Sequence, residues 1–94
     1  MSKPLLETLL AVAARYSHCS VKQFKSKVRN RHLDESRLLF VALAKSFNYR
    51  HYEIGWALDR TRTTINHYAK KTKECAADPY FERQVAELIK RATK

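Results

Sequence analysis

The chain has 94 residues, which is enough for one domain with a modest core and too few for two. Its hydrophobic content of 45% excludes disorder on compositional grounds, and one Gly with two Pro supplies too few turns for a sheet of short strands. Nineteen Lys and Arg against nine Asp and Glu give a formal net charge of +10. Such an excess predicts a polyanionic partner, with DNA, RNA, an anionic membrane and an acidic protein as the candidates.

The cysteine and histidine content indicates neither a disulfide framework nor a metal site. Cys19 and Cys75 are too few for such a framework and favour reduced thiols, and so a cytoplasmic protein. Their spacings to His18 and His32 match no zinc pattern. Because no nucleophile with a base and no catalytic carboxylate pair is recognisable, we predict neither an enzyme nor a cofactor or small-molecule substrate.

Apolar residues at helical spacing predict an all-α fold of about six helices. The first helix runs from about Lys3 to Tyr16, with Pro4 in its first turn. Its periodicity assigns it to the mature fold rather than to a leader, and no run is long enough to span a bilayer. The second helix begins at Ser20, which has capping-box spacing to Gln23, and a basic loop follows at about 25–32. The buried face of the first helix is predicted to hold Leu5, Leu6, Leu9, Val12, Ala13 and Tyr16.

The third helix is predicted from about Glu35 to Phe47, with Asp34 as its N-cap. Residues Leu38 to Ala44 are continuously apolar, and a helix that is apolar all round belongs at the centre of a fold. Asn48 is suited to the left-handed position that ends a helix. We therefore expect the other helices to pack around this one.

Three further helices complete the predicted domain. The fourth covers about Tyr52 to Leu58 and the fifth about Arg62 to Cys75. Asp78 is the expected N-cap of the sixth, with Pro79 in its first turn. The inward stripe of this last helix is predicted to hold Phe81, Val85, Leu88 and Ile89.

The segment from about 52 to 75 has the spacing of a helix-turn-helix. Ile54 and Leu58 supply the inner face of its first helix, and Gly55, the only Gly, stands where the two helices would approach closely. A Gly inside a helix costs about 1 kcal/mol, which suggests a packing reason for it. Asp59 stands in the turn, where Gly is usual, and tolerates the left-handed region. The inner face of the second helix is predicted to hold Ile65, Tyr68, Ala69 and Thr72.

The outer face of the second helix has the residue types that read bases in a major groove. Arg pairs with guanine, Asn pairs with adenine, and the methyl group of Thr contacts thymine. Thr61 is expected to cap the helix, and Arg60, Lys71 and Lys73 are expected to reach phosphates. The predicted outward side chains are Arg62, Thr63, Asn66, His67 and Lys70.

The basic residues are concentrated in two segments. Residues 22–31 and 60–73 together hold ten of the 19 Lys and Arg and no acidic residue. That distribution is typical of a nucleic-acid-binding face. Trp56 lies away from Ile54 and Leu58, and we expect it to pack against the third helix, with an exposed protein interface as the alternative.

From about Tyr16 to Ala92, the chain resembles the C-terminal DNA-binding domain of the bacterial replication initiator DnaA. Residues 20–31 are similar to that family's short helix and basic loop, and residues 36–47 to its central helix. Residues 53–55 and 62–71 are similar to its helix-turn-helix. The resemblance implies a domain that binds double-stranded DNA with both elements. The initiator's phosphate-binding loop is absent, so we expect a free-standing DNA-binding domain.

The resemblance also implies roles for individual residues. Arg29, followed by Arg31, matches the family's minor-groove arginine, and Thr61 and Arg62 replace its Asp and His, which predicts a different base preference. Together with the pattern above, this predicts a DNA interface formed by Lys27, Arg29, Arg31, Arg60, Thr61, Arg62, Thr63, Thr64, Asn66, His67, Lys70 and Lys71.

The predicted function is sequence-specific DNA binding by a small replication or transcription regulator, encoded by a bacterium, a phage or a mobile element. The alternative is an interaction module that binds a replication or transcription factor and has only non-specific DNA affinity. RNA binding is less favoured, because neither an aromatic stacking platform nor an RNA-binding motif is recognisable. A homodimer, which would favour palindromic sites, stays open.

Overall fold

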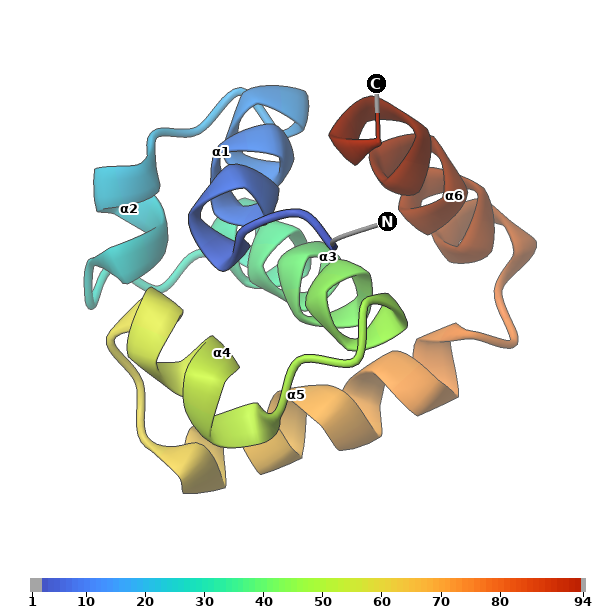
Figure 1. Ribbon diagram of the computed structural model, residues 1–94. Helices are drawn as coiled ribbons and strands as arrows, with labels where there is room; N and C mark the ends of the chain where they lie inside the picture. The colour runs from blue at the N-terminus through green and yellow to red at the C-terminus, as the bar shows by residue number, and fades with distance from the viewer. Residues whose placement is uncertain (1–2, 94) are drawn as a thin grey trace.

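The computed structural model describes residues 3–93 and is all-helical over that range. Its six helices confirm the predicted fold class and chain order, and Figure 1 shows how they are arranged. None of the helices in this range is long and apolar enough to cross a membrane. The helices are α1 (Leu6–Tyr16), α2 (Val21–Lys25), α3 (Arg31–Ser46), α4 (His51–Leu58), α5 (Arg62–Cys75) and α6 (Pro79–Ala92).

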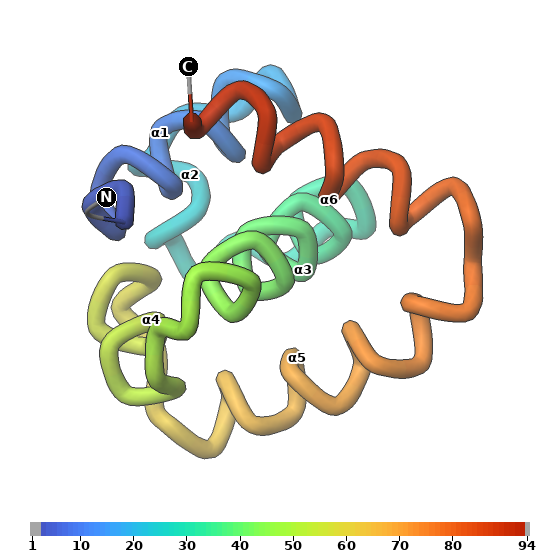
Figure 2. The backbone as a smooth tube through the Cα atoms, turned by 45° about the vertical axis from the view of Figure 1, so that its right-hand side comes forward, coloured from blue at the N-terminus to red at the C-terminus, as the bar shows by residue number. Residues whose placement is uncertain are grey.

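Helix α3 runs through the middle of the molecule, as its continuous apolar run predicts. In Figures 1 and 2, α1 and α6 lie on one side of it and α4 and α5 on the other. Phe40, Val41, Leu43 and Ala44 on α3 have no exposed surface. Because the neighbouring helices cover α3 from several sides, its apolar run from Leu38 to Ala44 is not interrupted by a polar, solvent-facing stripe.

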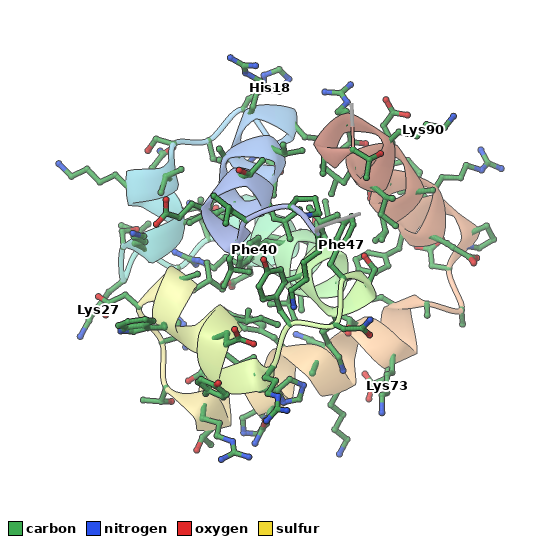
Figure 3. The ribbon with its side chains drawn as sticks, viewed as in Figure 1. His18, Lys27, Phe40, Phe47, Lys73 and Lys90 are labelled. Atoms are coloured by element: carbon green, nitrogen blue, oxygen red, sulfur yellow. The ribbon has the colours of Figure 1, made fainter. Side chains whose placement is uncertain are left out.

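The core draws on all six helices. In Figure 3, Phe40 lies inside the molecule, whereas Lys27 and Lys73 project from it. Phe24 brings the short helix α2 to the same core, because its side chain is fully buried. The other large apolar side chains without exposed surface are Leu9, Leu43, Ile54, Leu58, Ile65 and Leu88.

Several predicted helix ends are confirmed. Ser20 and Gln23 form a reciprocal capping box at the start of α2, with N···O distances of 3.0 and 2.8 Å. Asn48 is left-handed (φ 65°), and the Asp78 side chain accepts a hydrogen bond from the Tyr80 N–H at the start of α6. Each of these groups satisfies a backbone donor or ends a helix as its residue type predicts.

Two predicted helix starts are wrong. Helix α3 begins four residues earlier than expected, because Asn30 rather than Asp34 accepts the capping bond, from the Leu33 N–H at 2.8 Å. Asp34 lies inside the first turn, where its charge is favourable near the helix N-terminus. Helix α1 begins only at Leu6, so Pro4 precedes it, and Leu5 is 68% exposed instead of buried.

Candidate nucleic-acid interface

Helices α4 and α5 cross closely at Gly55, as the sequence predicts. A Cβ atom at this position would lie 2.8 Å from the Arg60 carbonyl oxygen and 3.2 Å from Cγ1 of Ile65. Ile54, Leu58 and Ile65 have no exposed surface around the crossing. The absence of a side chain at Gly55 therefore fixes how near α5 lies to α4.

The turn between α4 and α5 is a Schellman motif. Asp59 is left-handed (φ 55°, ψ 48°), and the N–H of Arg60 donates to the carbonyl of Gly55 at 2.8 Å. The N–H of Asp59 donates to the carbonyl of Trp56 at 3.3 Å. Asp59 thus occupies the position that Gly most often takes in this motif, as the sequence predicts.

Asp59→Gly is expected to stabilise the fold by about 1 kcal/mol, because Gly adopts the left-handed conformation without a Cβ penalty. Thermal unfolding followed by circular dichroism should show an increase in Tm of roughly 4–8 °C. Asp59→Asn is the control, since it removes the same charge and keeps a side chain that tolerates this conformation. An equal increase in both variants would assign the effect to charge rather than to the backbone.

Helix α5 presents the predicted polar face to solvent. Thr61 caps it by accepting a hydrogen bond from the Thr64 N–H, and Ile65, Ala69 and Thr72 are buried beneath it. Thr64 is half-buried, and its hydroxyl lies 3.1 Å from that of Thr61. The predicted residues exposed on this helix are Arg62, Thr63, Asn66, His67, Lys70 and Lys71.

One residue of the outer face is in contact with α4. The Oδ1 atom of Asn66 lies 2.6 Å from Nδ1 of His51. When Nδ1 donates in this contact, the amide nitrogen of Asn66 stays available as a donor to an external acceptor. The sequence pattern did not predict that His51 would orient this side chain.

The predicted basic loop is an extended segment, residues 26–30, between α2 and α3. Lys27 and Arg29 are exposed on it, as is Val28 (57%) between them. Arg31 lies in the first turn of α3, where its exposed side chain pairs with Glu35 at 3.4 Å. Because an exposed pair of this kind contributes little to stability, Arg31 can leave Glu35 and bind another anion with a small loss of free energy.

The basic loop begins beside the turn that precedes α5. Figure 1 shows the two segments along one edge of the molecule. The guanidinium of Arg60 donates to the carbonyls of Lys25 and Ser26, which are 35 and 34 residues away in sequence. Residues from the two predicted basic segments are therefore in direct contact, and Arg60 itself is half-buried rather than free in solvent.

The structure adds cationic residues that the sequence analysis did not select. Lys45 at the end of α3 and Arg50 before α4 line one hollow of about 500 Å³ with Arg62, and no acidic side chain lines it. Three cationic side chains at one hollow whose lining includes no carboxylate form an electrostatically favourable place for an anion. The only signal in the sequence is that Lys45 and Arg50 flank the helix end at Asn48.

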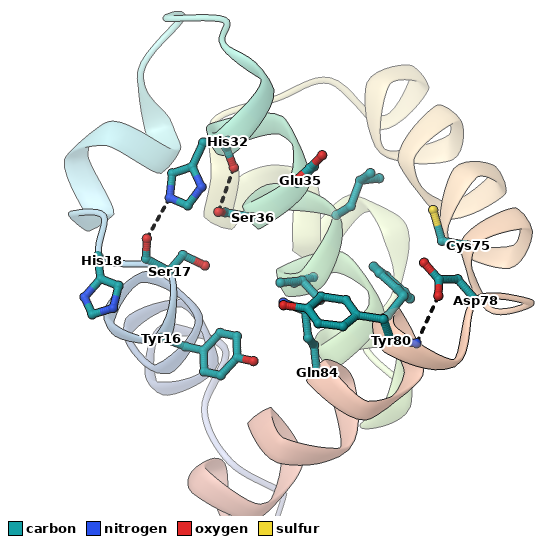
Figure 4. A pocket seen from close by; sticks show the side chains of 13 residues that line it. Tyr16, Ser17, His18, His32, Glu35, Ser36, Cys75, Asp78, Tyr80 and Gln84 are labelled. Atoms are coloured by element: carbon teal, nitrogen blue, oxygen red, sulfur yellow. Dashed lines mark hydrogen bonds between the residues drawn. The ribbon is translucent and has the colours of Figure 1, made fainter.

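A larger hollow of about 600 Å³ lies between the end of α1, the start of α3 and the start of α6, as Figure 4 shows. Two of its polar side chains bond to the protein's own backbone: His32 Nε2 lies 2.8 Å from the Ser17 carbonyl, and the Ser36 hydroxyl donates to the His32 carbonyl. Within residues 3–93, no three His, Cys, Asp or Glu side chains gather as metal ligands would.

Trp56 does not pack against α3, so that prediction is wrong. Its side chain is 89% exposed on the outer face of α4, and Tyr52, one turn earlier, is 59% exposed. Helix α4 buries Ile54, Gly55 and Leu58 instead, and Trp56 lies on the opposite side of this short helix. The alternative interpretation, an exposed aromatic surface, agrees with this placement.

No protein-family model matches the chain, and no curated protein matches its sequence.

Proposed function

We propose that the protein binds double-stranded DNA with sequence preference, using α4 and α5 as a helix-turn-helix and the basic loop as a second contact. The single observation that carries the proposal is the contact of Arg60 with Lys25 and Ser26. It joins the two cationic segments of the sequence into one surface without an acidic residue in either segment. Two adjoining cationic segments, one of which includes an exposed helix face, supply what phosphate contacts and base reading require.

The roles of the residues follow from their exposure and chemistry. Arg62, Thr63, Asn66 and His67 are the proposed base-reading residues in the major groove, because they are exposed along the first two turns of α5. Arg29 is the proposed minor-groove residue, as the resemblance to the initiator's DNA-binding domain implies. Phosphate contacts are proposed for Lys27, Arg31, Lys45, Arg50, Lys70 and Lys71.

This proposal can be tested by fluorescence anisotropy at several salt concentrations. The three duplexes are the initiator family's binding site, a scrambled control and a site selected from a random pool. We expect preferential binding of the selected site, with an affinity that falls steeply as salt rises. Weak and equal binding to all three duplexes, lost near physiological salt, would contradict sequence-specific reading.

Lys71→Ala is expected to weaken binding to all three duplexes by a similar factor. The exposed ammonium of Lys71 is assigned to one phosphate. Its removal should therefore reduce the salt slope, which is the steepness of the fall of log affinity with log salt concentration, by about 0.9. The slope is measured from the same anisotropy titrations. Lys90→Ala on α6 is the control, because it removes one exposed positive charge outside the proposed interface. An unchanged slope for Lys71→Ala would remove this residue from the interface.

A protein partner is the second candidate, and the exposure of Trp56 and Tyr52 favours it. Exposed neighbouring aromatic side chains are enriched where proteins associate. A replication or transcription factor as that partner is compatible with the resemblance to the initiator. The anisotropy result that contradicts DNA reading would make this aromatic face of α4 the first surface to examine.

A further inference from the structure

Two arginines from different segments of the chain bind the carbonyls at the start of the basic loop. Arg37 on α3 is 1% exposed, and it donates to the carbonyls of Gln23, Phe24 and Ser26 at 3.0, 3.0 and 2.9 Å. The carbonyls at the end of an α-helix lack regular partners within it, so the bonds to Phe24 and Ser26 satisfy groups that α2 leaves open. The Gln23 carbonyl also accepts from the N–H and the hydroxyl of Ser26. Arg37 thereby fixes the point at which the chain leaves α2.

Arg60, which precedes α5, binds the same end of α2. Its guanidinium donates to the carbonyl oxygens of Lys25, at 3.3 Å, and Ser26. It also donates to the carbonyl oxygens of Leu58, at 3.3 Å, and Asp59, at 3.2 Å, in its own turn. One side chain therefore bridges the loop and the turn before α5. Within residues 3–93, no other hydrogen bond connects these two segments.

We infer that Arg60 is a positioning residue, which acts with Arg37 to hold the loop bearing Lys27 and Arg29 at a fixed distance from the start of α5. This inference rests on the proposed DNA-binding function. The planar guanidinium has five donors and can span carbonyls of two segments, whereas a Lys ammonium has three donors at one point. Because the loop is already ordered, less entropy is lost when it and α5 bind a duplex together.

A first experiment tests whether Arg60 and Arg37 act as a clamp on the loop, and it uses the free protein without DNA. Limited trypsin digestion followed by mass spectrometry measures the rate of cleavage after Lys27 and Arg29. Arg60→Lys keeps the charge but cannot bridge the carbonyls, and we expect it to speed cleavage in the loop about tenfold. Arg83→Lys, at an exposed position of α6, is the control and should leave the rate unchanged. Equal rates in wild type and Arg60→Lys would overturn the inference.

A second experiment separates positioning from a direct phosphate contact. We expect Arg60→Lys and Arg60→Ala each to weaken binding of the selected duplex about tenfold, with far-UV circular dichroism confirming that both variants fold. In an Arg29→Ala background, the same changes should have little further effect, because they act through the loop. Wild-type affinity for Arg60→Lys, or independent losses in the double variants, would overturn positioning. If the wild-type protein binds no duplex, the proposed function fails, while the digestion still decides whether the clamp exists.

Discussion

Gly55→Val is expected to destabilise the fold by about 3 kcal/mol or more, because it places a branched side chain where α4 and α5 cross. Even the Cβ atom would lie 2.8 Å from the Arg60 carbonyl oxygen, which belongs to the backbone and has little freedom to move. The total stability of a domain of this length is about 5–14 kcal/mol. The substitution therefore removes a large part of the stability, or all of it.

The measurement is urea unfolding of wild type, Gly55→Ala and Gly55→Val. We expect the loss to increase in that order, although Ala by itself is the better helix former by about 1 kcal/mol. Ala86→Val, at an exposed position of α6, is the matched control for the lower helix propensity of Val and should cost less than 1 kcal/mol or so. A Gly55→Val variant as stable as this control would show that the close crossing is not required.

The fold was predictable because the helices differ sharply in their apolar pattern. The run from Leu38 to Ala44 allows only a buried helix, and this is the element that the others surround. Gly55 and Asp59 each carry a local conformational signal, and the structure confirms both the crossing and the left-handed turn. In these places local propensity and tertiary packing favour the same conformation.

The helix start at Asn30 could not be predicted with the same ease, because Asn30 and Asp34 are equally good caps. The choice between them depends on Arg37, which binds the end of α2. With Asp34 inside the helix, its Oδ1 atom lies 3.2 Å from the guanidinium of Arg37 and pairs with it. A bond between residues 11 to 14 positions apart leaves no mark in the periodicity of a sequence.

The placement of Trp56 was missed for a different reason. Large aromatic residues are usually buried to a considerable degree, and this general preference favoured a position against α3. A helix of eight residues has only one narrow buried face, and Ile54, Gly55 and Leu58 already fill it. The face that remains for Trp56 is exposed, in agreement with the alternative expectation of an exposed interface.

The candidate interface was predictable as two charged segments, although their spatial relation was not. Ten cationic residues in two runs indicate a polyanion, but their contact through the bonds of Arg60 to Lys25 and Ser26 appears first in the folded structure. The hollow formed by Lys45, Arg50 and Arg62 likewise joins the ends of three helices. This second cluster gives Arg62 two possible partners in a complex, a base edge and a phosphate.

Arg62→Ala is expected to weaken binding of the preferred duplex by about 1–3 kcal/mol, and to relax base preference at one position of the site. Arg62 is exposed at the first residue of α5, where a guanidinium can form two hydrogen bonds to a guanine. The measurement is anisotropy on four duplexes, which are the selected site and the three sequences that differ from it only at the position assigned to Arg62. The loss on the preferred duplex should be roughly five- to 150-fold, with much smaller losses on the other three.

Arg62→Lys distinguishes base reading from attraction to a phosphate in the hollow beside Lys45 and Arg50. The Lys variant keeps the charge but loses the paired hydrogen bonds, so we expect it to lose base preference while it keeps most of its non-specific affinity. Arg83→Ala on α6 removes the same charge from an exposed position outside the interface and should leave both quantities near wild type. Equal losses on all four duplexes for Arg62→Ala, restored by Arg62→Lys, would make Arg62 a phosphate contact and would move base reading to Thr63, Asn66 and His67.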